Sequence, residues 1–88
     1  MSMNLHPMYE INGLFETPDW FIQTPTDITY KVLEHDNLED QLQEYMKWVR
    51  SVFDDSDNKW VIEREEKVCD RCRKFAASPN IKFELGCS

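Results

Sequence analysis

Apolar residues recur every three or four positions in two segments of the chain, the spacing that places them on one face of an α-helix. In residues 36–53 the apolar positions are Leu38, Leu42, Tyr45, Met46, Val49, Val52 and Phe53. Residues 60–78 place Val61, Val68, Cys72, Phe75 and Ala76 inward and stop before Pro79, since helix is disfavoured in the residue preceding a proline. The sequence therefore predicts two helices.

Acidic residues mark the starts of both predicted helices. Asp36 with Glu39 three residues later fits a capping box, in which side chains satisfy the free N–H groups of the first turn. The segment DDSDN (54–58) is predicted to be a loop that also caps the second helix.

Shorter segments rich in Ile, Tyr, Phe, Trp and Thr indicate β-strands. Three lie in the first half of the chain, separated by turns at ETP and PTD: YEINGLF (9–15), DWFIQT (19–24) and ITYKVLE (28–34). A last strand over 81–85 alternates, with Ile81, Phe83 and Leu85 on one side. The predicted fold class is α+β, a small antiparallel sheet of about three N-terminal strands plus one C-terminal strand, packed against two helices.

Length and composition support one folded domain over residues 1–88. An 88-residue chain can build a modest core, and 41% hydrophobic residues exceed what disordered chains carry. No apolar run exceeds three residues and the first fifteen lack a basic start, so we expect a soluble, unsecreted protein. Three cysteines, an odd number, argue against a disulfide framework and for the cytoplasm.

Negative charge is concentrated in the first half of the chain. The net charge is −7, yet residues 47–88 carry nine bases and eight acids, whereas residues 1–46 carry nine acids against one Lys. A surface of this sign repels nucleic acid and anionic lipid and attracts basic protein surfaces. We therefore expect a basic, DNA-binding protein as the partner, with no direct binding to nucleic acid or membrane.

Within the first predicted helix, acidic residues line the face opposite the apolar one. Asp36, Asp40 and Glu44 are spaced four residues apart, about 6 Å along the helix axis, and each like-charged pair costs about 0.2–0.5 kcal/mol. A solvated helix start that complements the helix dipole explains Asp36 and Glu39. It explains Asp40 and Glu44 poorly, because they lie deeper in the helix. Such a row can imitate the phosphates of a nucleic-acid strand.

The second predicted helix differs, because Glu63 with Lys67 and Asp70 with Lys74 form favourable i, i+4 pairs. The contrast leaves the first helix as the uncompensated one.

A strongly acidic cytoplasmic chain of this length, without a catalytic or metal signature, resembles the small phage DNA-mimic anti-restriction proteins of the Arn-like class. The resemblance is one of class over the whole chain, and the basic segment RCRK (71–74) departs from it. It implies an early phage protein in the host cytoplasm, a dimer that imitates a duplex and occupies the DNA-binding site of a restriction enzyme or histone-like nucleoid protein. The implied phosphate mimics are Glu34, Asp36, Glu39, Asp40, Glu44, Asp54, Asp55 and Asp57.

The cysteines support the main alternative, a small structural or adaptor domain stabilised by zinc. Cys69 and Cys72, followed by Cys87, have part of the spacing of a zinc ribbon, and His35 or His6 would supply the fourth ligand. However, the pair lies inside a predicted helix, where a buried Cys is an ordinary core residue. We therefore expect no cofactor.

No enzyme is predicted. His6 and His35 have no nucleophile and orienting acid at a recognisable spacing, and two glycines, Gly13 and Gly86, cannot form a phosphate-binding loop. A redox role for the Cys-x-x-Cys pair is disfavoured because about two turns of predicted helix precede it, whereas reactive pairs begin a helix.

Trp48 is the expected interface residue, since it lies at the flank of the apolar face and Trp is a common interface anchor. The alternative is that sheet or loop residues such as Trp20 and Phe21 cover it. A homodimer could bury it in either case.

Overall fold

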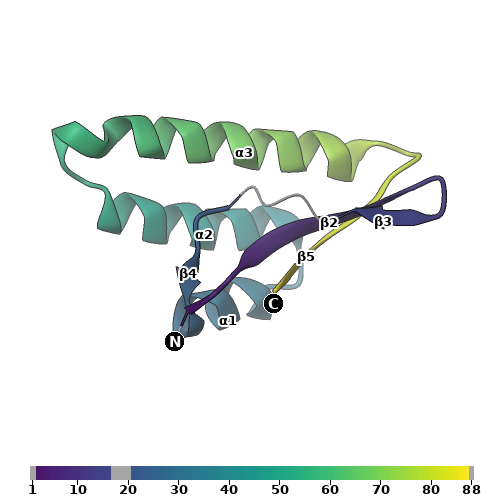
Figure 1. Ribbon diagram of the computed structural model, residues 1–88, viewed down its shortest axis with the longest axis horizontal. Helices are drawn as coiled ribbons and strands as arrows, with labels where there is room; N and C mark the ends of the chain where they lie inside the picture. The colour runs from purple at the N-terminus through teal and green to yellow at the C-terminus, as the bar shows by residue number, and fades with distance from the viewer. Residues whose placement is uncertain (1, 17–20, 88) are drawn as a thin grey trace.

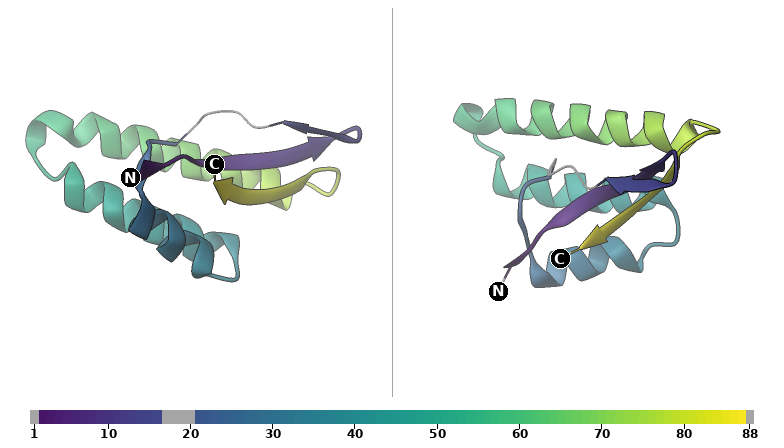
Figure 2. Two further views of the ribbon diagram at one scale, coloured as in Figure 1. Left: turned by 60° about the horizontal axis from the view of Figure 1, so that its bottom comes forward. Right: turned by 45° about the vertical axis from the view of Figure 1, so that its right-hand side comes forward.

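The computed structural model describes residues 2–16 and 21–87 and places them in an α+β fold (Figure 1). Its elements are β1 (Ser2–Met3), β2 (Leu5–Ile11), β3 (Leu14–Glu16), β4 (Thr24–Pro25), α1 (Thr26–Glu34), α2 (Leu38–Val52), the short 3-10 helix η1 (Ser56–Asn58), α3 (Lys59–Ala77) and β5 (Lys82–Cys87). An antiparallel sheet has the order β3-β2-β5, and β1 pairs separately with β4. Helices α2 and α3 lie side by side and antiparallel, with the larger sheet crossing them on one side (Figure 2).

The predicted strand over residues 9–15 is wrong at its centre, because a turn divides it. Asn12 and Gly13 have φ angles of 54° and 82°, the left-handed values that a two-residue type I′ hairpin requires. Ile11 therefore stands opposite Leu14, and β2 and β3 form an antiparallel hairpin. Asn-Gly is the strongest short-range hairpin signal, so the turn at Asn12–Gly13 could have been predicted from the sequence.

Residues 28–34 form part of α1, so the strand predicted there is wrong and the fold has a third helix. Pro25 precedes the first helical residue, and the hydroxyl of Thr29 donates a hydrogen bond to the Pro25 carbonyl at 3.1 Å. Thr29 and Val32 are fully buried, so packing of this helix face overrides the β-propensity of its branched residues. The strand predicted over 19–24 lies partly outside the described residues, and only Thr24 of its described part belongs to a strand.

The two helices predicted from the apolar spacing are confirmed as α2 and α3, with local corrections. The N-cap of α2 is Asn37 rather than Asp36, and its side-chain oxygen accepts from the Asp40 backbone N–H at 2.9 Å. Val52 is half exposed and Ala76 is exposed, so neither belongs to the core where the helical spacing placed it. The loop over 54–58 ends in the 3-10 helix η1, which Asp55 caps. The capping predicted for the second helix is wrong, because the N-cap of α3, Asn58, makes no side-chain capping hydrogen bond.

The sheet contributes its odd-numbered residues to the core. Leu5, Tyr9 and Leu85 are buried, and the Tyr9 ring stacks on Phe75 of α3 with centroids 5.1 Å apart. Lys82 and Glu84 of β5 are exposed, as the predicted alternation requires. The main core cluster joins these strands to all three helices through Leu5, Phe21, Val32, Leu42, Tyr45, Met46, Val49, Val68, Cys69, Cys72 and Leu85.

A polar contact crosses the centre of this core. The Tyr45 hydroxyl of α2 donates a 2.6 Å hydrogen bond to Glu65 of α3, and the backbone N–H of Ile22 donates to the same hydroxyl at 3.1 Å. Glu65 is fully buried, and its other carboxyl oxygen accepts from Arg64 Nε at 2.9 Å. Burial, then the hydrogen bond to Glu65, raises the pKa of Tyr45 far above its usual value, so the phenol stays a donor.

Replacing Tyr45 by Phe should lower the free energy of unfolding by about 1–3 kcal/mol, because a buried Glu65 oxygen and the Ile22 N–H then lose their partner. Urea denaturation followed by circular dichroism measures this loss. The matched control is Tyr30→Phe at an exposed position of α1, where we expect a change below about 0.5 kcal/mol. Equal stability of the two variants would contradict a structural role for the Tyr45 hydroxyl.

Candidate functional site

The eight predicted phosphate mimics fall into two groups at opposite ends of α2. We call Glu34, Asp36, Glu39, Asp40 and Glu44, which surround the junction of α1 and α2, the acidic corner. We call Asp54, Asp55 and Asp57, which lie between α2 and α3, the acidic loop. All are exposed except Glu44, which is half-buried. They do not form one continuous row.

Glu39 is compensated by a residue that lies 34 positions away in the sequence. Arg73 of α3 donates to both carboxylate oxygens of Glu39, at 2.7 and 3.1 Å, and also to Asp70 at 2.7 Å. The hydrogen bonds from Arg73 and then Gln43 hold the pKa of Glu39 below its usual 4.5. Arg73 thus takes the place of Lys74 as the partner of Asp70, and the RCRK segment supplies the cation that offsets part of the acidic corner.

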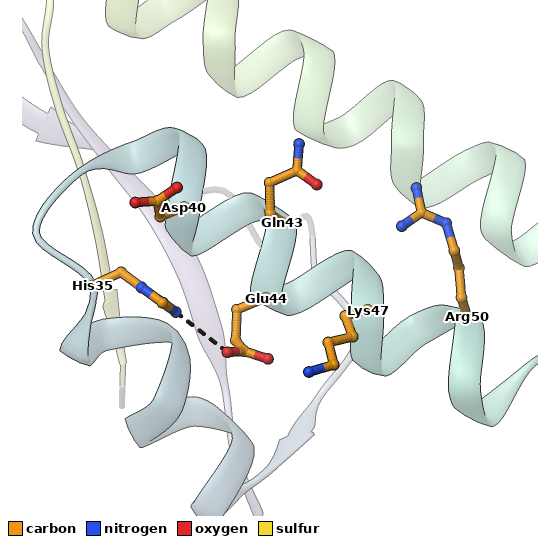
Figure 3. A pocket seen from close by; sticks show the side chains of 6 residues that line it. All are labelled: His35, Asp40, Gln43, Glu44, Lys47 and Arg50. Carbon is orange, nitrogen blue, oxygen red and sulfur yellow. Dashed lines mark hydrogen bonds and ion pairs between the residues drawn. The ribbon is translucent and has the colours of Figure 1, made fainter.

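Glu44 also has an internal partner. His35, in the α1–α2 junction, lies 3.2 Å from a Glu44 oxygen through its Nε2, and the side chain of Glu44 is 22% exposed (Figure 3). The predicted row of three carboxylates therefore loses its last member as a freely available group.

Six of the eight predicted phosphate mimics have no ion-pair partner among residues 2–16 and 21–87. They are Glu34, Asp36, Asp40, Asp54, Asp55 and Asp57. Asp40 accepts a hydrogen bond from the Asn37 amide at 3.0 Å, and one Asp55 oxygen accepts from Asn58. These bonds fix the orientation of the two carboxylates and leave their charges uncompensated.

An open depression of about 300 Å³ runs along α2 beside the acidic corner. Its lining residues are His35, Asp40, Gln43, Glu44, Lys47 and Arg50 (Figure 3). Arg50 is already paired with Glu66 of α3 at 3.0 Å. The depression holds carboxylates beside two cations, so it is a surface of mixed charge, and the uncompensated negative charge lies around its Asp40 end.

The proposed zinc ligands are not brought together. Cys69 and Cys72 lie in the core side of α3, Cys87 lies in β5, and His35 faces Glu44. Within the described part of the chain, no group of three His, Cys, Asp or Glu side chains could hold a metal ion. Burial is the main cause that raises the pKa of both Cys69 and Cys72 to about 12, which makes them core thiols.

Trp48 packs against the core and lies with its ring 6.1 Å from that of Tyr45, so it is not the exposed anchor that the helical wheel predicted. Among the residues whose burial the structure describes, the exposed aromatics are Trp60, at 60%, and Tyr30, at 55%. Trp60 begins α3 directly after the acidic loop. No sequence signal distinguishes the exposed Trp60 from the packed Trp48, since both tryptophans flank apolar helix faces.

No protein-family profile, curated protein or solved structure matches the chain. Within residues 2–16 and 21–87, no helix combines the length and apolar character needed to cross a membrane.

The contact with Arg73 predicts a measurable shift at Glu39. Carboxyl resonances followed by NMR during an acid titration should give Glu39 a pKa below 4.5 in the wild type and a higher one in Arg73→Ala. Because the folded-state pKa is lowered, the pair stabilises the protein at neutral pH and its contribution is lost as the pH falls through that pKa. Lys74→Ala is the control and should leave the Glu39 pKa unchanged.

The burial of the thiols predicts their order of reaction. In the native protein at pH 8, Cys87 should react with a thiol reagent first, because Cys69 and Cys72 are nearly inaccessible and remain protonated. All three should react rapidly in denaturant. Stopped-flow absorbance measures the phases, and rapid native labelling of Cys69 would contradict the core assignment.

Proposed function

We propose that this protein is a non-catalytic inhibitor that occupies the DNA-binding site of a basic host protein, such as a restriction enzyme or a histone-like nucleoid protein. The observation that carries the proposal is the set of six exposed carboxylates without an ion-pair partner among the described residues, at both ends of α2. Other carboxylates of the two long helices, Glu39, Glu66 and Asp70, are paired with arginines, whereas Glu63 of α3 is exposed and has no ion-pair partner among the described residues.

The electrostatics favour a protein partner over nucleic acid. The chain carries a net charge of −7, and its bases are used in part for internal contacts between α2 and α3, through Arg50 and Arg73. A basic DNA-binding surface binds fixed carboxylates favourably, because they replace the DNA phosphates, which carry charge of the same sign.

Within the acidic corner, the roles differ from residue to residue. Asp40 is fixed by Asn37, and Glu34 and Asp36 lie next to it at the end of α1 and in the junction. Glu39 and Glu44 are held by Arg73 and His35, so they contribute to the shape of the corner more than to its available charge. We assign direct contact with the partner to Glu34, Asp36 and Asp40, joined by the acidic loop.

A competition assay tests the proposal. The purified protein is added to a labelled duplex bound by a histone-like nucleoid protein, and displacement of the duplex is followed by fluorescence anisotropy. Asp40→Lys should raise the concentration needed for half-displacement about tenfold, since it replaces an attraction by a repulsion. Displacement should weaken as salt rises from 0.05 to about 0.3 M, where the Debye length shortens to roughly 6 Å.

The matched control is Glu63→Lys, the same charge reversal at an exposed position of α3 outside both acidic groups. It should change the half-displacement concentration by less than about threefold. If the two variants behave alike, the effect comes from net charge and the assigned surface is wrong. If no basic protein from a host lysate is retained by the immobilised wild type at low salt, the function as an inhibitor is refuted and the adaptor-domain alternative stands.

A further inference from the structure

β5 is an edge strand of the three-stranded sheet. The sheet order is β3-β2-β5, so β5 pairs with β2 on one side, and within the described residues no strand pairs with its other side. Figure 2 shows β5 along the border of the sheet, opposite β3. An edge strand presents unpaired N–H and C=O groups, which form a ready template for a further strand.

The turn at Asn12–Gly13 fixes which backbone groups of β5 face outward. In a two-residue hairpin the flanking residues, Ile11 and Leu14, form a hydrogen-bonded pair, so the odd-numbered residues of β2 direct their N–H and C=O groups to β3. The even-numbered ones direct theirs to β5, where their partners are Lys82, Glu84 and Gly86. The outward groups of β5 are therefore those of Phe83, Leu85 and Cys87. Pro7 has no N–H to donate. It faces the β3 side of β2, beyond the last β2–β3 pair, where no described residue pairs with it.

We propose that β5 pairs with β5 of a second copy of this chain, antiparallel and about a two-fold axis at Phe83. With Phe83 opposite Phe83 of the second copy, Lys82 stands opposite Glu84 of that copy, and Glu84 opposite its Lys82. Two cross-strand ion pairs form in this register, since directly opposed side chains of antiparallel strands are in contact. The two three-stranded sheets become one sheet of six strands.

Several registers would pair the outward N–H and C=O groups of β5, and charge favours the one centred on Phe83. Moving the axis to Glu84 places Glu84 against Glu84 of the second copy, which is destabilising, and moving it to Leu85 leaves both charges opposite uncharged residues. Lys82 and Glu84 are both exposed and have no ion-pair partner among the described residues, so both are available. Phe83 is half-buried against the core, and its remaining surface is covered by Phe83 of the second copy.

Sedimentation equilibrium of the full chain at about 0.15 M salt, which screens the repulsion between two chains of net charge −7, tests the pairing. The wild type should show a monomer–dimer equilibrium at micromolar to millimolar concentration. Lys82→Glu and Glu84→Lys should each raise the dissociation constant about tenfold, since each variant opposes like charges twice in the dimer. The double variant Lys82→Glu with Glu84→Lys restores both pairs and should return within about threefold of the wild type.

The two single variants change the net charge in opposite directions, so equal weakening by both cannot come from overall repulsion. Lys67→Glu, at an exposed position of α3, is the control for added negative charge and should dimerise like the wild type. Amide hydrogen exchange gives a second readout: the N–H groups of Phe83 and Leu85 should become protected as concentration rises. A wild type that stays monomeric at millimolar concentration, or a double variant that stays as weak as the single ones, overturns the proposal.

Discussion

The hydroxyl of Tyr45 holds together three parts of the chain that are distant in sequence. The hydroxyl donates to Glu65 on α3 and accepts from the backbone N–H of Ile22. The Tyr45 ring packs edge-on against Phe21, with the ring centroids 4.8 Å apart. A phenol and a carboxyl group in the middle of an apolar core are stable only when both are hydrogen-bonded, so this contact fixes how α2 and α3 are aligned. The positions of the acidic corner and the acidic loop follow from that alignment, because they lie at the two ends of α2.

The parts of the fold that follow from local periodicity could be predicted from the sequence, and those that depend on distant contacts could not. The apolar spacing identified Leu42, Met46 and Val49 correctly, since a helix that buries one face must repeat with its own period. α1 was misjudged because Ile28, Thr29 and Val32 favour strands locally, and only packing against the core decides for helix. In the sequence, nothing distinguishes Glu65 from the other charged residues of its helix, and its role depends on the contact with Tyr45.

The candidate site shows the same division. Exposure of most of the acidic residues could be expected from the helical wheel, yet the compensation of Glu39 depends on Arg73, which only the antiparallel packing of α2 on α3 brings near. Arg73, from the basic RCRK segment that departs from the anionic pattern, links the two helices through Glu39, and Arg50 does so through Glu66. Fold geometry thus sorts carboxylates of similar sequence context into structural and available ones.

α2 also sets the distance between the acidic corner and the acidic loop. Its 15 residues, at about 1.5 Å each, keep the acidic corner and the acidic loop roughly 20 Å apart, and its ends are capped locally by the Asn37 side chain and the Phe53 backbone N–H. A binding surface with two basic patches at that separation can engage both groups at once, and the second contact is then intramolecular, with a high effective concentration. A short peptide with a single basic cluster gains no such advantage. Under the proposed function, selectivity among basic proteins would depend on the spacing of their charges as much as on their number.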